Sequence, residues 1–131
     1  MSETFMMKLD RMQPSQLFIS SAKLAQVMRD FGPLRPDSLA PIPVKELGGK
    51  VIMTDGHTRA LAALLAGLTE IRVVWDEDDL DWEEYDICVH WCEEEGIHTI
   101  ADLKDRIVSP VDYQRLWRDR CQAMHEELEQ A

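Results

Sequence analysis

The alternation of apolar and polar residues in the first half of the chain predicts short strands and two helices. Apolar residues at positions 24, 27, 28 and 31 follow the 3.6-residue spacing of an amphipathic helix that begins at Ser20 or Ser21. A second helix is expected over 58–66, which is rich in alanine and leucine and is followed by Gly67. Four runs fit strands: 5–12, 42–46, 50–54 and 70–75.

Helical spacing dominates the second half of the chain. Three helices are expected, over 81–95, 99–107 and 110–129. Their start and stop signals are Gly96, the capping-box pair Thr99 and Asp102, and Ser109-Pro110. Leu116 and Trp117 fall on the apolar stripe of the last helix, so we expect them to be buried.

Together these elements predict an α+β fold with a small mixed sheet. Gly48-Gly49 predicts that the strands at 42–46 and 50–54 form a hairpin. We expect a sheet-and-helix domain over residues 1–76 and an acidic helical extension over 77–131 that packs on it. Three prolines and a glycine in the segment 32–41 predict an irregular loop.

Charge is unevenly distributed along the chain, whose formal net charge is −11. Residues 1–75 hold nine basic and seven acidic residues, whereas residues 76–131 hold five basic and eighteen acidic ones. The acidic half would repel a nucleic-acid backbone, so binding to nucleic acid is not expected. It is typical of a solvated helical surface, with a docking site for a protein partner as the alternative. The acidic run 76–81 lacks the EF-hand pattern, so we expect a turn there and no metal site.

The number of cysteines and the lack of a long apolar run indicate a cytoplasmic protein. The three cysteines, Cys88, Cys92 and Cys121, are an odd number and suit a reducing compartment. No apolar run is long enough to cross a membrane, and the first residues do not form a signal peptide. A zinc site at Cys88, His90 and Cys92 lacks a second pair of ligands at the usual spacing, so these cysteines are expected in the core.

The most informative segment is 51–67, in which a β-branched run meets Asp55-Gly56 and then a helix. A helix that begins at this point presents free backbone N–H groups and the positive end of its dipole, which favour an anion such as phosphate. Gly56 allows close approach, His57 and Thr58 can donate hydrogen bonds, and Arg59 can hold a phosphate with its fork of donors. The alternative is an ordinary turn in which Thr58 caps the helix, Asp55 forms an Asx-turn and Arg59 is solvated.

The order of these elements resembles the ParB-like N-terminal domain superfamily, which includes sulfiredoxin and free serine kinases. The resemblance covers about residues 6–76 and is most specific at Pro41-Ile42-Pro43-Val44 and at Thr54-Asp55-Gly56-His57-Thr58-Arg59-Ala60. The Asp-Gly-His-x-Arg form is most similar to the serine-kinase branch. No cysteine precedes Cys88, which argues against sulfinic acid reduction of the sulfiredoxin type.

The resemblance implies that Gly56, His57, Thr58 and Arg59 bind nucleotide phosphates, with ATP or ADP and Mg²⁺ as the expected ligands. Asp55 and His57 would then be the catalytic candidates. The kinase branch places an acidic base just after the first strand, where this chain has Gln16, which cannot accept a substrate proton. Asp55 or Asp37 could take that role instead.

Three functions follow from the sequence. The first is a nucleotide-binding protein that transfers phosphate to a small hydroxyl substrate. The second is a non-catalytic interaction or regulatory module with the same fold, in which a protein partner meets the acidic half. The third is a DNA-associated protein of the partition type, against which the charge argues.

Overall fold

A four-stranded mixed sheet forms one layer of the protein. The computed structural model describes residues 3–30 and 39–130. The strand order is β1 (Thr4–Lys8), β5 (Glu70–Trp75), β3 (Ile42–Leu47) and β4 (Lys50–Met53). β5 runs antiparallel to β1 and parallel to β3, and β3 runs antiparallel to β4. The fold is therefore α+β with a mixed sheet, as the sequence predicts.

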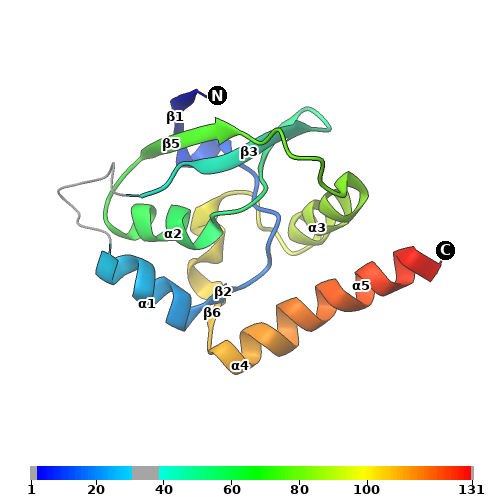
Figure 1. Cartoon of the computed structure of the whole chain (residues 1–131). Coiled ribbons are helices and arrows are strands. Elements are labelled where there is room, and N and C mark those ends of the chain that lie inside the picture. The colour runs from blue at the N-terminus through cyan, green and yellow to red at the C-terminus, as the bar shows by residue number, and fades with distance from the viewer. Residues whose placement is uncertain (1–2, 31–38, 131) are drawn as a thin grey trace.

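Helix α2 (His57–Leu65) connects β4 to β5 and covers one face of this sheet (Figure 1). The crossover returns the chain beside β3, which explains the parallel pairing of β3 with β5. Ile42 and Val44 of β3 and Val73 of β5 are fully buried, and so is Leu61 of α2. This layer fixes the beginning of α2 at the end of β4, where the candidate site lies.

The hairpin expected at Gly48-Gly49 is confirmed. Both glycines have positive φ, +60° and +81°, as a two-residue hairpin turn of type I′ requires. Val44 pairs with Met53, and Leu47 pairs with Lys50. The turn therefore sets the register that brings β4 to Thr54 and Asp55.

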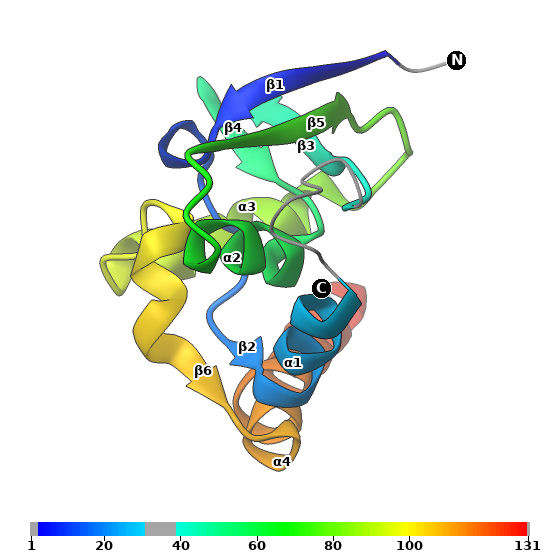
Figure 2. The ribbon, with the colours of Figure 1, turned by 90° about the vertical axis from the view of Figure 1, so that its left-hand side faces the viewer.

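A short pair of parallel strands, which the sequence does not predict, joins the two parts of the chain. β2 (Ile19–Ser20) pairs with β6 (Ile107–Val108), and α1 (Ser21–Asp30) follows β2 directly. Figure 2 shows β2 and β6 side by side below α2, on the side away from the main sheet. A two-residue strand has too few positions to show an alternating pattern, so its sequence carries no strand signal.

The second half is helical, as expected, with two departures. α3 (Trp82–Glu94) begins after the cap residue Asp81, whose side chain accepts a hydrogen bond from the Glu84 N–H at 3.2 Å. The helix expected over 99–107 is instead a 3-10 helix, Ile100–Arg106, that leads into β6; its capping box at Thr99 and Asp102 is present. The last helix consists of α4 (Pro110–Tyr113), a π-helical turn (Gln114–Arg118) and α5 (Asp119–Gln130).

The π-helical turn has a physical reason in the spacing of the inward-facing residues. Tyr113, Trp117 and Cys121 are each four residues apart, and the first two are 8% exposed. A regular helix of 3.6 residues per turn would rotate such a series away from the core. One wider turn keeps the three side chains on the same face.

A single hydrophobic cluster includes residues of both halves. Ala60 and Leu61 of α2 belong to it together with Ile97, Ile100 and Leu103 from the second half. α2 packs against the 3-10 helix Ile100–Arg106. The segment 77–131 therefore shares the core of segment 1–76.

One strand prediction is wrong in its extent. The strand expected over 5–12 ends at Lys8, and Leu9–Arg11 form a 3-10 turn. Lys8 is the last residue that pairs with β5, opposite Glu70, and Leu9 and Met12 turn into the core. The loop expected over 32–41, including Asp37, lies mostly outside the described residues. Within the described ranges, no helix is long and apolar enough to cross a membrane.

Candidate functional site

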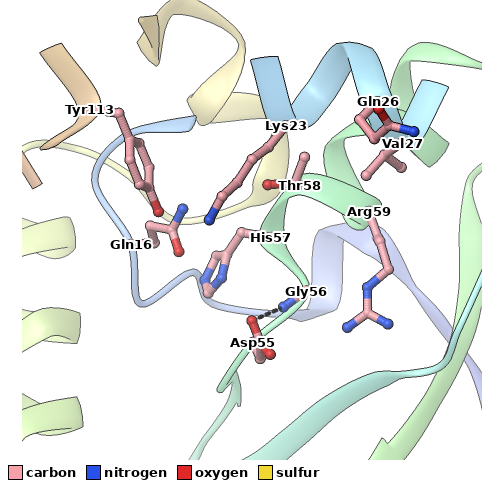
Figure 3. Close-up of a pocket in the computed structure, with 10 residues that line it drawn as sticks. All are labelled: Gln16, Lys23, Gln26, Val27, Asp55, Gly56, His57, Thr58, Arg59 and Tyr113. Carbon is pink, nitrogen blue, oxygen red and sulfur yellow. Dashed lines mark hydrogen bonds between the residues drawn. The ribbon is translucent and has the colours of Figure 1, made fainter. Parts of the chain in front are cut away.

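The site begins at the sharp turn between β4 and α2. Gly56 occupies the cap position of α2 with φ +78°, and no side chain caps the first turn of this helix. Thr58 lies inside the helix, so the alternative in which Thr58 is the cap is wrong. Asp55 Oδ1 accepts a hydrogen bond from the Gly56 N–H at 2.8 Å (Figure 3). The N–H groups of the first turn are thus left for water or a ligand.

Glycine is required at position 56 for a second reason besides its φ angle. A Cβ atom on residue 56 would lie 2.7 Å from Arg59 Nη2 and 2.8 Å from Ile42 Cδ1. The Arg59 guanidinium therefore lies directly against the turn. Among the described residues, Arg59 has no hydrogen-bond or ion-pair partner. Its donors remain available to an anion at the start of α2.

His57 is buried and neutral. Its side chain is 3% exposed, and Nε2 accepts a hydrogen bond from the backbone N–H of Ser15 at 2.9 Å. Burial lowers the pKa of His57 from 6.5 to about 4, and the nearby Asp55 carboxylate offsets this only in part. With Nε2 acting as acceptor, the proton is on Nδ1, which has no partner among the described atoms. His57 thus holds the segment that carries Ser15 and Gln16 against α2.

A cavity of about 420 Å³ opens in front of this turn. We call it the α2 cavity. Figure 3 shows that Lys23 from α1 and Tyr113 from α4 extend toward His57 and Thr58 from the opposite side. Lys23 Nζ lies 5.5 Å from the centre of the Tyr113 ring. The residues that line the cavity are Gln16, Lys23, Gln26, Val27, Asp55, Gly56, His57, Thr58, Arg59 and Tyr113.

The charges around the α2 cavity favour an anionic ligand. Lys23 and Arg59 each contribute a positive charge, the start of α2 contributes its dipole, and Asp55 is the one acidic side chain among the described lining residues. Because His57 is neutral, it adds no charge. A phosphate group fits this distribution better than a cation does.

Gln16 lies at the wall of the α2 cavity, where the resemblance places an acidic base. Its amide donates a hydrogen bond to the Phe18 carbonyl oxygen at 2.8 Å, so it is held within its own loop. An amide cannot take a proton from a substrate hydroxyl. Asp55 is therefore the candidate base that the described part of the cavity offers.

A second cavity of about 270 Å³ adjoins the first, and we call it the thiol cavity. Gln16 and His57 contribute to the walls of both cavities. On its far side stand α3 and the last helix, and Tyr85 donates a hydrogen bond to the Thr54 carbonyl oxygen at 2.9 Å. The lining residues are Ser15, Gln16, Thr54, His57, Glu84, Tyr85, Cys88, Trp117, Cys121 and Met124.

All five residues predicted from the sequence line the α2 cavity, namely Asp55, Gly56, His57, Thr58 and Arg59. Two further lining residues, Lys23 and Tyr113, come from elements distant in sequence and are not predicted. Lys23 carries one weak signal, because it stands in the first turn of α1 beside the apolar face that packs on α2. Tyr113 reaches the cavity because β6 pairs with β2, a contact without a sequence signal.

The other clusters that the sequence highlights have structural roles. Cys88 and Cys92 are buried in α3, as expected, whereas the His90 side chain is 71% exposed and pairs with Glu94. Asp76 accepts a hydrogen bond from the Thr54 hydroxyl at 2.6 Å and therefore ties the end of β5 to the end of β4. Across the described residues, no three His, Cys, Asp or Glu side chains converge as metal ligands.

Comparisons with known proteins address the fold alone. No family model and no curated protein matches the chain. Among solved structures, it is similar to protein Atu1540 from Agrobacterium tumefaciens, with a TM-score of 0.54 and 13% sequence identity. The alignment covers 79% of this chain and 62% of that protein, so the chain spans less than two thirds of its length. At this identity the likeness shows a shared fold.

Proposed function

We propose that the α2 cavity binds the phosphate groups of a nucleotide, ATP or ADP, together with Mg²⁺. The observation that carries the proposal is the Arg59 guanidinium, which lies against Gly56 at an uncapped helix start and has no partner among the described residues. Lys23 supplies a second cation from the facing helix. The cavity volume of about 420 Å³ lies within the range typical of small-ligand sites.

In this proposal, different lining residues bind different parts of the ligand. The first-turn N–H groups of α2 and Arg59 hold one phosphate, and Lys23 holds the rest of the polyphosphate. Bound Mg²⁺ would offset the phosphate charge, and Asp55 is the carboxylate near enough to the turn to face it.

The reaction we propose is phosphate transfer to a small hydroxyl compound, in the manner of the ParB-like family's serine-kinase branch. Such transfer depends mainly on positioning and on charge stabilisation, which Arg59 and Lys23 can supply. Asp55 would receive the proton of the attacking hydroxyl. Its carboxylate is exposed at the mouth of the cavity, where a substrate can reach it.

A second candidate function is favoured by Gln16 and His57. The Gln16 amide is engaged with its own loop, and His57 Nε2 is engaged with Ser15. Neither of these two groups can then act as a general base at neutral pH. This arrangement suits a module that binds a nucleotide without chemistry and passes the signal to a protein partner, as the acidic second half would allow.

A thermal-shift panel of ATP, ADP, CTP and GTP, each with and without Mg²⁺, tests the proposed ligand. A ligand at a hundredfold excess over its Kd stabilises the native state by about 2.7 kcal/mol, so binding raises the unfolding temperature measurably. We expect one adenine nucleotide to give the largest shift. If no nucleotide shifts the transition, the proposed site is wrong.

Phosphorus NMR of the shifted sample with a panel of small hydroxyl compounds separates the two candidate functions. A new phosphate ester that forms at the expense of the nucleotide supports the transferase. Binding without any new ester supports the non-catalytic module instead.

A further inference from the structure

Two cysteines from different helices border the thiol cavity. Cys88 of α3 and Cys121 of α5 both line it, and the helices that carry them face each other there. They are 33 positions apart in sequence, and both belong to or pack against the hydrophobic core. Both thiols are free in the structure. Neither has a role in the proposed nucleotide site.

The helices are held in the register that brings these thiols together. One turn before Cys88, Glu84 Oε1 lies 2.6 Å from Nδ1 of His125, which is one turn after Cys121. This contact, together with the cavity that both cysteines line, places residues 88 and 121 at facing positions of two antiparallel helices. The proximity of the two thiols is therefore a property of the helix packing. A disulfide requires side chains that face each other at close range.

The geometry points to a dithiol: we propose that Cys88 and Cys121 are oxidised by low-molecular-weight disulfides to an intramolecular disulfide that links α3 to α5. Both residues line the thiol cavity, which gives a reagent access to Cys121. Cys121 is partly exposed, whereas Cys88 is 7% exposed, so the reagent meets Cys121 first.

The two thiols differ in reactivity in the direction that such an exchange needs. Interaction with the Cys88 thiol lowers the pKa of Cys121, and the neighbouring Arg120 lowers it further. The same interaction between the thiols, and burial, raise the pKa of Cys88. Cys121 is thus the attacking thiolate and Cys88 the resolving thiol.

The exchange proceeds in two balanced steps. The Cys121 thiolate attacks one sulfur of the reagent disulfide, which forms a mixed disulfide and releases one reagent thiolate. Cys88 then loses its proton and attacks the Cys121 sulfur, which releases the second reagent thiolate. Two cysteine thiols are oxidised and one reagent disulfide is reduced to two thiols, which take up the two protons.

Cys92 provides a control within the same helix. It lies one turn after Cys88 and is fully buried, and its thiol donates a hydrogen bond to the Gln16 carbonyl oxygen at 3.6 Å. Burial raises the pKa of Cys92 to about 12. It has no partner thiol and should remain reduced.

The test is equilibration of the folded, reduced protein with oxidised glutathione, followed by acid quenching, intact mass and a thiol count in denaturant. We expect the count to fall from three thiols to one, with a mass lower by two hydrogens and no glutathione attached. A peptide map should join the segments of Cys88 and Cys121. Retention of all three thiols, a persistent glutathione adduct or a disulfide-linked dimer would each overturn the proposal.

Single cysteine variants test whether Cys88 and Cys121 are the two residues that form the disulfide. Cys92→Ser should still form the internal disulfide and lose all remaining thiols, whereas Cys121→Ser should form no internal disulfide. The thiol count and the intact mass are measured on the wild-type protein, so the proposal can still be tested if a variant does not fold. Because nucleotide binding plays no part in the experiment, its outcome is independent of the proposed function.

Discussion

The backbone N–H of Ser15 donates a hydrogen bond to Nε2 of His57, 42 positions later in the chain. This bond joins the segment before α1 to the first residue of α2 and lies in the wall shared by the two cavities. It also sets the state of the imidazole, since a ring nitrogen that accepts from an amide carries no proton. His57 is therefore first a positioning residue.

Replacement of His57 by alanine should destabilise the protein. The Ser15 N–H would lose its acceptor in a buried place and a void would remain, so we expect a loss of about 2–4 kcal/mol in the free energy of unfolding. Urea unfolding measures it. His57→Gln, which keeps an acceptor, should lose less, and His90→Ala on the exposed face of α3 should change stability by less than about 0.5 kcal/mol. Equal losses for His57→Ala and His57→Gln would contradict the role given to the Ser15 bond.

The lowered pKa of His57 predicts a pH dependence of stability. In the unfolded chain the imidazole has its ordinary pKa of 6.5, and in the folded protein about 4, so the unfolded state binds more protons between these values. Stability is therefore fully present above pH 6.5 and falls as the pH drops toward 4, by about 3 kcal/mol. Urea unfolding at a series of pH values should show this fall, and His57→Gln should flatten it. If the free energy of unfolding of the variant fell with pH as steeply as that of the wild type, groups other than His57 would cause the pH dependence.

His125 should have the opposite pH dependence. Glu84 and Glu129 raise its pKa, with the hydrogen bond to Glu84 as the largest cause. The pair of α3 and α5 is therefore stabilised below pH 6.5, and this contribution is lost as the pH rises through the higher folded pKa. An NMR titration of the imidazole should place its pKa above 6.5. Glu84→Gln should bring that pKa down, and a pKa that does not move would show that the contact is not maintained in solution.

Alanine at position 56 should be costly for two reasons. The left-handed backbone costs a side chain about 1–2 kcal/mol, and the added Cβ would also collide with Arg59 and Ile42. Gly67→Ala is the matched control, because Gly67 has φ +92° but open space around its Cβ direction. Thermal unfolding should show a larger loss for Gly56→Ala than for Gly67→Ala. Similar losses would mean that Arg59 does not pack against the turn.

Arg59→Ala should weaken nucleotide binding while it leaves the fold intact. A hydrogen bond to a charged group contributes about 1.5–3 kcal/mol, so the Kd for the bound adenine nucleotide should rise by about 10- to 100-fold in calorimetry. Arg115→Ala, whose side chain is 65% exposed and pairs with Asp112, is the control and should bind as wild type does. An unchanged Kd for Arg59→Ala would contradict the proposal that Arg59 binds a nucleotide phosphate.

Local signals in the sequence predict the part of the fold that forms the turn. Gly48-Gly49, Gly56 and Gly67 each have a positive φ, and they mark the hairpin and both ends of α2. The β-branched runs between them give the strands. The five candidate residues are consecutive in sequence, so the prediction of their common location needs no tertiary information.

The opposite wall of the α2 cavity could not be predicted in this way. Lys23 and Tyr113 meet there only because β2 pairs with β6, and two residues are too few for a periodic signal. The proximity of Cys88 and Cys121 at the thiol cavity is hidden for a related reason, since the π-helical turn Gln114–Arg118 sets the rotation of α5. Such features depend on packing between distant segments.

The pairing of β2 with β6 has a consequence for synthesis in the cell. Ile19 and Ser20 leave the ribosome before their partners Ile107 and Val108, which emerge about 90 residues later. The surroundings of Lys23 and of the Ser15 loop are therefore incomplete until these partners have been synthesised. The sheet can close first, around the local hairpin, whereas the cavity forms among the last events of folding.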